Sequence, residues 1–232
     1  MNEADGRTAA RHGEIWEAFR GHPQATPVSD RPLMPPEIVA TLGFVIPVED
    51  AGVRERLSDV VARLDATGCV IPFRPDYWHI TIVPPAFITS GEPDPPRLMP
   101  RSFVQEALDG GREAVRGRDR FDVEVRGLNA FRDVVVAVPY DGGRGLELGG
   151  LIRSAVAEMP DRYPDGNEPL PHISLAQYSR SEGLEALVDV VQSERETELG
   201  RLQVRELSMF VLPWEDGIPG LVQKHAMPLA AS

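Results

Sequence analysis

Cysteine is almost absent from this chain of 232 residues, since Cys69 is the only one. A single cysteine excludes both an intrachain disulfide and a cysteine-rich zinc site. Long apolar runs are missing too: the stretch 134–138 is far too short to span a membrane. The first residues, MNEADGR, are acidic and contain no apolar core segment, so we expect no signal peptide. Together these absences predict a soluble cytoplasmic protein.

Basic residues are scarce. Lys and Arg total 24 against 36 Asp and Glu, which gives a formal net charge of −12. Proteins that follow a long phosphate backbone depend on clustered Lys and Arg, so this balance argues against long nucleic acids. We expect neither long nucleic acid nor membrane as a partner, and we expect a monomer. The hydrophobic content of 42% with 26% charged residues is typical of a globular protein.

Two regions are distinguished along the chain. Residues 1–36 are predicted to be an N-terminal extension, with a short amphipathic helix around Trp16 and Phe19 and a Pro-rich segment after it. This extension either packs the two aromatic residues on the main body or forms a lid over a site. Residues 37–232 are predicted to form a single domain.

Strands and helices alternate in a mixed order after the extension. Helices are predicted over 51–65, 100–115, 146–159 and 182–195, and strands over 41–48, 69–73, 77–85, 121–128, 133–140, 171–178, 202–212 and 221–229. Many neighbouring strands have the spacing of hairpins, which favours an α+β fold over a doubly wound parallel sheet. The second half repeats the order of the first loosely.

Two of the predicted strands carry nearly the same tetrapeptide, His79-Ile80-Thr81-Ile82 and His172-Ile173-Ser174-Leu175. Side chains alternate between the two faces of a strand, so His79 and Thr81 share one face and His172 and Ser174 share another. Each strand therefore presents an imidazole beside a hydroxyl, with aliphatic residues behind. A zinc site formed by both histidines and His225 is a weaker alternative, because no further ligand lies at a short spacing.

The paired motifs resemble those of the two-histidine (2H) phosphoesterase superfamily, which includes 2′,3′-cyclic phosphodiesterases and 2′-5′ RNA ligase-like proteins. The resemblance covers about residues 38–230 and leaves out the extension and a Pro-rich insert at 91–100. It implies a bilobal α+β fold, with two pseudo-symmetric sheet lobes and outer helices around a central cleft. It also implies that the two motifs face each other across this cleft.

Hydrolysis of a phosphodiester needs a base for the attacking oxygen and an acid for the leaving oxygen, and histidine serves as either near neutral pH. The resemblance gives these roles to the two motif histidines, and we assign His172 as the base and His79 as the acid. The hydroxyls of Thr81 and Ser174 would bind the non-bridging oxygens. No metal or other cofactor is expected.

Three neighbouring side chains are candidates for substrate binding. By strand alternation, Tyr77 and Tyr178 share the faces of the motifs and could stack on a base, while Arg74 could supply a cation for phosphate. The expected substrate is a small nucleotide or an RNA end, hydrolysed at a phosphodiester such as a 2′,3′-cyclic phosphate. The alternatives are a 2′-5′ RNA ligase or RNA-end processing enzyme, a non-catalytic nucleotide-binding module, and a structural protein with incidental histidines.

Overall fold

A computed structural model describes residues 2–31, 34–94, 98–161, 163, 169–215, 218–219 and 222–231. Pro32 in the extension and residues 95–97 of the Pro-rich insert are outside the described residues. None of the described helices is both long enough and apolar enough to cross a membrane.

Strands β1 to β11 form one sheet, in which every pairing is antiparallel except that of β3 with the short β4. The strands are β1 (Ile38–Pro47), β2 (Val70–Pro72), β3 (His79–Thr89), β4 (Leu98–Met99), β5 (Phe121–Ala130), β6 (Val134–Tyr140), β7 (Ile173–Tyr178), β8 (Glu198–Val204), β9 (Glu206–Glu215), β10 (Ile218–Pro219) and β11 (Gln223–Pro228). The helices are α1 (Glu3–Gly21), α2 (Ala51–Asp65), α3 (Phe103–Val115), α4 (Arg144–Ala155) and α5 (Glu185–Ser193), with single 3₁₀ turns η1 (Val28–Asp30) and η2 (Pro75–Tyr77).

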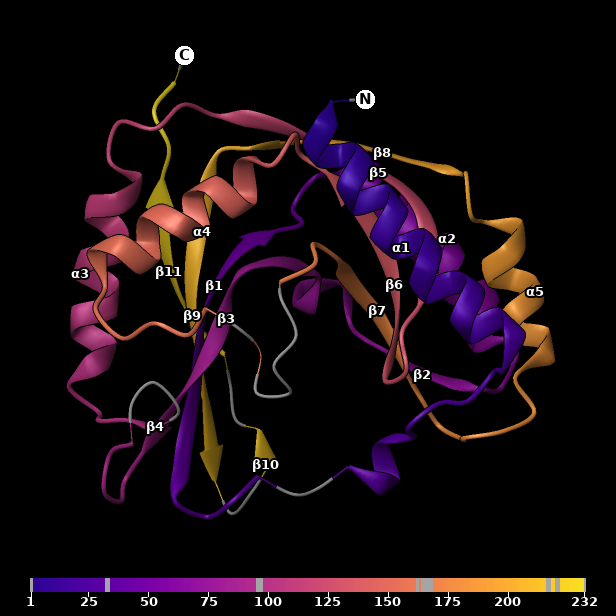
Figure 1. The fold of residues 1–232 in the computed structure, drawn as a ribbon, viewed down its shortest axis with the longest axis horizontal. Helices are drawn as coiled ribbons and strands as arrows, with labels where there is room; N and C mark the ends of the chain where they lie inside the picture. The colour runs from indigo at the N-terminus through magenta and orange to yellow at the C-terminus, as the bar shows by residue number, and fades with distance from the viewer. Residues whose placement is uncertain are drawn as a thin grey trace.

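The sheet consists of two lobes that meet where β3 lies beside β7. The strand order is β10-β9-β1-β3-β7-β6-β5-β8, with β11 on β9, β2 on β7 and β4 on β3. Helices α3 and α4 pack on the first lobe, and α2 and α5 pack on the second (Figure 1). The predicted bilobal α+β fold is therefore confirmed, with a curled antiparallel sheet as its centre.

Helix α2 has the bounds that its apolar spacing predicts. The residues Val53, Leu57, Val60 and Leu64 are all at most 1% exposed and lie at helical spacing. Asp50 caps the helix, because its carboxylate accepts a hydrogen bond from the Val53 amide at 2.9 Å. The apolar stripe packs on β2, β7 and β8, so a helix that follows a strand of the first lobe stabilises the second.

The predicted strand 202–212 is two strands in the structure. The chain leaves β8 after Val204 and begins β9 at Glu206. Strand β8 pairs with β5 in the second lobe, whereas β9 pairs with β1 in the first. A continuous apolar alternation in the sequence hides this break, because both strands have one buried face.

The N-terminal helix is longer than predicted, since α1 runs from Glu3 to Gly21. The side chain of Asn2 caps it by accepting from the Asp5 amide at 2.9 Å, and Glu3 pairs with Arg7 one turn later. Figure 1 shows α1 running diagonally across β5 and β6, which it contacts. Trp16 and Phe19 are buried there, so the expectation that they pack on the main body is confirmed.

Helix α4 lies directly against the strand that carries the first motif, because it has glycine where the backbones meet. A β-carbon on Gly149 would be 2.2 Å from the carbonyl oxygen of Ile82 in β3. The next residue, Gly150, has no atom within 4 Å of the same position. Glycine at 149 thus permits a backbone-to-backbone approach that no other residue allows.

We therefore expect Gly149→Ala to lower the free energy of unfolding by about 2 kcal/mol or more, since helix or strand must move. The matched variant Gly150→Ala should leave stability unchanged or raise it by up to about 1 kcal/mol through helix propensity. Urea denaturation of both variants measures the difference. Equal stabilities would contradict the close packing of α4 on β3.

Candidate active site

The two histidine motifs lie beside each other at the junction of the lobes. Strands β3 and β7 pair through Ile80 and Ile173, the central residues of the two motifs. In an antiparallel pair, this register sets His79 toward Ser174 and Thr81 toward His172. Both isoleucines are at most 1% exposed. The four polar side chains are half-buried on the other face, as strand alternation predicts.

Each of the two imidazoles is fixed by a hydrogen bond of the same kind. Nδ1 of His79 lies 2.6 Å from the carbonyl oxygen of Tyr77, and Nδ1 of His172 lies 2.8 Å from that of Leu170. In each case the acceptor is the carbonyl two residues earlier in the chain. A carbonyl can only accept, so Nδ1 carries the proton in both rings. Each neutral imidazole therefore has its lone pair on Nε2, which can accept a proton.

The environment keeps both imidazoles neutral. Burial is the main cause that lowers the pKa of His79 from 6.5 to about 4, and nearby His172 and Lys224 lower it further. The hydrogen bond to Tyr77 opposes this shift. Burial also lowers the pKa of His172. A positive charge on His172 thus adds to the effect of burial on the pKa of His79.

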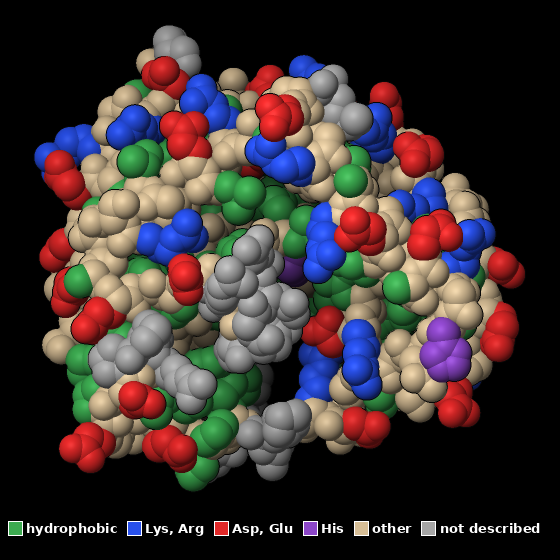
Figure 2. Space-filling view, viewed as in Figure 1, with side chains coloured by type: hydrophobic (Ala, Val, Ile, Leu, Met, Phe, Trp, Pro, Cys, Tyr) green, Lys and Arg blue, Asp and Glu red, His purple; other side chains and the backbone are tan. Residues whose placement is uncertain are grey.

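A pocket of about 480 Å³ opens beside His79. Its walls are mainly apolar and come from β1, β9 and β11 and from the segment between β2 and β3; they include Val45, Pro47, Phe73, Tyr77, Phe210, Leu212 and Val222. Figure 2 shows the face drawn there hollowed near its middle, with Lys and Arg side chains along one rim. The volume and apolar walls are those of a small-molecule site with few polar groups.

Phe210 of β9 forms part of the pocket and contacts the first motif. Its ring centroid is 5.8 Å from that of His79. Gly43 of β1 lies opposite Phe210, and a β-carbon there would be 2.6 Å from the phenyl ring. The glycine therefore leaves the space that this ring occupies. Phe210 is not among the residues predicted from the sequence, because an apolar residue in a strand carries no signal that separates a pocket from a core.

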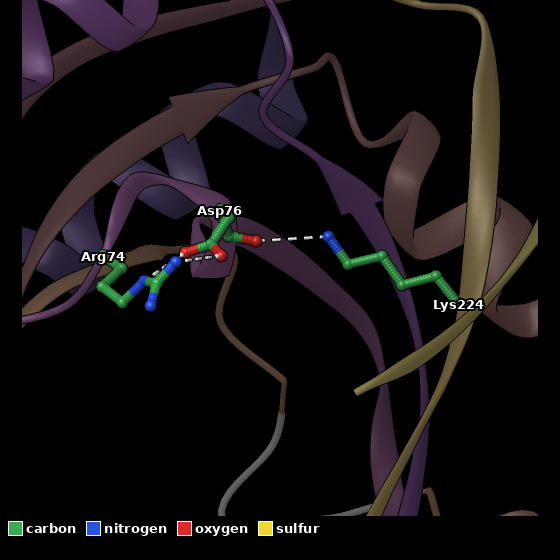
Figure 3. A network of polar contacts seen from close by, with 3 residues as sticks. All are labelled: Arg74, Asp76 and Lys224. Carbon is green, nitrogen blue, oxygen red and sulfur yellow. Dashed lines mark hydrogen bonds and ion pairs between the residues drawn. The ribbon is translucent and has the colours of Figure 1, made fainter. Parts of the chain in front are cut away.

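Lys224 of β11 supplies a cation to the same pocket. Its Nζ donates a hydrogen bond to the backbone carbonyl of Asp76 at 3.2 Å (Figure 3). Lys224 is not among the predicted site residues either, although a signal exists, because it is the sole lysine of the chain. In a protein of net charge −12, a cation beside His79 makes the site more favourable for an anion than the surface as a whole.

Of the predicted binding residues, Arg74 and Tyr77 both lie in the pocket wall. Arg74 pairs with the carboxylate of Asp76 through contacts of 3.1 and 3.2 Å, so part of its charge is already neutralised (Figure 3). Tyr77 belongs to η2 rather than to β3, so strand alternation is not the reason for its position. Its ring stacks on Phe73 at 4.8 Å and meets His79 edge-on at 5.2 Å.

The prediction that Tyr178 binds substrate is wrong. Its side chain is fully buried, and its hydroxyl donates to the carbonyl oxygen of Phe131 at 2.9 Å. Ala176 pairs with Val135 while Ser174 pairs with Val136, so β7 contains one extra residue, a β-bulge. The bulge reverses the alternation that follows it and turns Tyr178 to the core face.

Within the described ranges, no group of three or more His, Cys, Asp or Glu side chains is placed to hold a metal ion. His225 lies on β11, where it pairs with Met209. The half-buried Thr81 and Ser174 add hydroxyls next to the two imidazoles. The arrangement thus offers two imidazoles for proton transfer at Nε2 and two hydroxyls that can donate hydrogen bonds to an anion.

Nuclear magnetic resonance of ¹⁵N-labelled histidine tests this description. We expect His79 to titrate near pH 4 and both motif histidines to carry their neutral proton on Nδ1. Lys224→Met removes a positive charge and should raise the pKa of His79. The pKa of His12, which does not depend on Lys224, is the internal control. A His79 pKa of 6.5 or above in the unaltered protein would contradict the desolvated site.

Comparisons with known proteins agree with this geometry. The family model described as "2'-5' RNA ligase superfamily" matches residues 77–212, more than half of the chain and both motifs. No curated protein matches. The Thermus thermophilus protein TT0787 superposes with a TM-score of 0.57 at 18% identity, over 81% of this chain and 97% of that one. Escherichia coli LigT complexed with ATP gives 0.54 at 17%, over 82% and 99%. The chain belongs to the 2′-5′ RNA ligase superfamily of two-histidine phosphoesterases.

Proposed function

We propose that the protein is a metal-independent phosphodiesterase that hydrolyses a small nucleotide phosphodiester such as a 2′,3′-cyclic phosphate. The observation that carries the proposal is the matched pair of imidazoles on β3 and β7. Each ring donates from Nδ1 to the carbonyl two residues earlier and leaves Nε2 unprotonated. Such a pair can serve as the base and the acid of one in-line displacement.

The reaction follows from these positions. Nε2 of His172 takes a proton from water as the water oxygen attacks phosphorus. The bond from phosphorus to the ribose 2′ or 3′ oxygen breaks, and His79 in its protonated form gives its proton to that oxygen. The product is a nucleoside monophosphate, and the two histidines are left with their protonation states exchanged. Proton exchange with water restores the starting state.

An anionic substrate favours the protonated form of His79 that the reaction needs, with the proton taken from water. In the free protein both imidazoles are neutral near pH 7, because burial lowers the pKa of each. A phosphate between them is an opposite charge within a few ångströms, and this raises the pKa of the imidazole that faces the leaving oxygen. The hydroxyls of Thr81 and Ser174 are the donors available to the non-bridging oxygens.

The pocket beside His79 supports a nucleoside as the organic part of the substrate. Its volume of about 480 Å³ and its aromatic walls, Phe73, Tyr77 and Phe210, suit a base and ribose. Lys224 and Arg74 add positive charge for phosphate. A structure of Escherichia coli LigT complexed with 3′-AMP has a TM-score of 0.52 to this chain at 19% identity. The net charge of −12 favours small substrates over long RNA.

A panel of 2′,3′-cyclic nucleotides in excess EDTA tests the proposal. We expect turnover that persists in EDTA and falls by about 10² to 10⁴ in each of His79→Ala and His172→Ala. The matched control is His22→Ala, because His22 is an exposed histidine outside the site. Loss of activity with metal chelation, or full activity in either motif variant, would overturn the mechanism.

Other outcomes distinguish the alternative functions. Joining of RNA 2′,3′-cyclic and 5′-hydroxyl ends by the folded protein would identify a ligase instead. Nucleotide binding without product would identify a binding module. If the protein neither binds nor turns over any nucleotide, and the motif variants lose only stability, then the histidines are structural residues.

The pH dependence of kcat/KM is a further prediction. In the productive free enzyme, one of the two histidines is protonated on Nε2 and the other is neutral. The pKa values of both histidines lie below 6.5. The singly protonated fraction therefore peaks below pH 6.5 and falls up to about tenfold per pH unit above its upper pKa. Lys224→Met raises the pKa of His79 and should move the alkaline limb to higher pH. An optimum at or above about pH 7 in the unaltered protein would contradict this account.

A further inference from the structure

His12 of α1 is a buried histidine whose two ring nitrogens are both hydrogen-bonded. It is 1% exposed. Its Nε2 lies 3.0 Å from the carbonyl oxygen of Pro171, so Nε2 carries the proton and donates. Its Nδ1 accepts from the side-chain amide of Asn129 at 2.9 Å. This is the tautomer opposite to that of His79 and His172, and it leaves His12 with no nitrogen for proton transfer.

Asn129 is itself fixed in the orientation that His12 requires. Its amide nitrogen also donates to the backbone carbonyl of His12 at 2.8 Å, and its side-chain oxygen accepts from the Ala130 amide at 2.9 Å. Every polar atom of the two side chains therefore has a partner. A buried and fully satisfied pair of this kind is rigid, and it specifies a single arrangement of α1 on β5.

The pair lies on the face of the sheet that carries the second motif. Asn129 of β5 is opposite Val136 of β6, and Val136 is opposite Ser174 of β7. Residues opposite each other in an antiparallel sheet share a face, so Asn129 and Ser174 lie on the same face two strands apart. Helix α1 therefore covers the sheet next to the proposed site.

Two contacts connect His12 to His172. Pro171, whose carbonyl His12 holds, is the residue directly before His172, and β7 begins only at Ile173. The ring of Phe131 stacks on His12 with centroids 5.6 Å apart and meets the ring of His172 edge-on at 5.2 Å. His12 thus holds both the peptide that leads into His172 and the ring against which that imidazole rests.

We propose that His12 is a positioning residue that holds His172 in the orientation required for proton transfer. This rests on the proposed function, because it takes His172 as one of the two histidines that act on the substrate. His12 acts through its hydrogen bond to Pro171 and its contact with Phe131. Helix α1 is then part of the site, although residues 3–21 lie outside the range 77–212 that the superfamily matches.

The neutral form of His12 is the one that this role requires. Nδ1 must accept from Asn129, and a protonated imidazole has no acceptor. Burial is the main cause that lowers the pKa of His12 from 6.5 to about 4, and the positive charges of His172 and Arg195 lower it further. The residue therefore holds its two partners without adding charge beside His172 at neutral pH.

Two substitutions of His12 separate its contact with Pro171 from its contact with Asn129. In His12→Gln the side-chain amide reaches the place of Nε2 and can still donate to the Pro171 carbonyl. In His12→Asn the side chain ends near the place of Nδ1, so the contact with Asn129 is kept and that with Pro171 is lost. The control is Trp16→Leu, which removes a buried side chain of the same helix whose indole bonds Gln192 at 3.2 Å, away from His172.

Steady-state kinetics on a 2′,3′-cyclic nucleotide and ¹⁵N-histidine spectra are measured on the full chain for all four proteins. We expect His12→Asn to lower kcat by about tenfold to a hundredfold with KM within about twofold, the signature of a misplaced catalytic group. His12→Gln should restore kcat to within about threefold of the unaltered protein. Trp16→Leu should lower Tm while kcat of the folded protein stays within about twofold.

The same spectra report on His172 directly. We expect its pKa and its Nδ1-protonated signal to change in His12→Asn and to return to normal in His12→Gln. Equal kinetics and equal His172 spectra in the Asn and Gln variants would overturn the proposal. Loss of kcat in Trp16→Leu to the same degree would also overturn it, because docking of α1 in general would then be the cause.

Failure of the proposed function is a separate result. If the unaltered protein turns over no nucleotide, the spectra still decide whether His12 fixes the state of His172. An altered His172 signal in His12→Asn would then support the positioning contact and reject only the activity. An unchanged signal in a folded His12→Asn protein would reject the positioning contact itself.

Discussion

The pairing of Ile80 with Ile173 is the contact on which the site depends, because it joins two sheet lobes at the centres of two like motifs. The pair turns both aliphatic side chains to the core and both imidazoles to the other face. Each ring is then fixed by the carbonyl two residues before it, at 2.6 Å for His79 and 2.8 Å for His172. Two halves of different sequence thus reach the same proton arrangement through backbone geometry alone.

The surroundings of the two histidines differ, and this asymmetry gives the site its two sides. His79 faces the pocket with Phe210, Tyr77 and the cation Lys224. His172 faces Phe131 and the helix α1, where buried groups are fully hydrogen-bonded. The His79 side thus has space and positive charge for a ligand, while the His172 side is closely packed and fixed by hydrogen bonds. A substrate that fits this asymmetry has an organic group on the His79 side of its phosphate.

Local pattern was enough to predict the α+β class, the bounds of α2 and the shared face of each imidazole with its hydroxyl, because these depend on the order of elements, helical spacing and strand alternation. The bilobal arrangement was predicted from the resemblance of the paired motifs to a known superfamily. The sequence did not predict features set by contacts distant in the chain. A bulge in β7 turns Tyr178 into the core, the split at Arg205 sends β9 to the other lobe, and α1 is longer than its few apolar residues suggest. Phe210 and Lys224 join the site only because their strands are neighbours in the sheet.

The central claim is that both histidines move protons and neither forms a bond to phosphorus. Hydrolysis of one diastereomer of a nucleoside 2′,3′-cyclic phosphorothioate in ¹⁸O-labelled water tests it, with the configuration at phosphorus of the product as the readout. A single in-line attack by water, with one imidazole as base and the other as acid, inverts that configuration. Retention would contradict the account, because two successive displacements through a phosphohistidine would then be required.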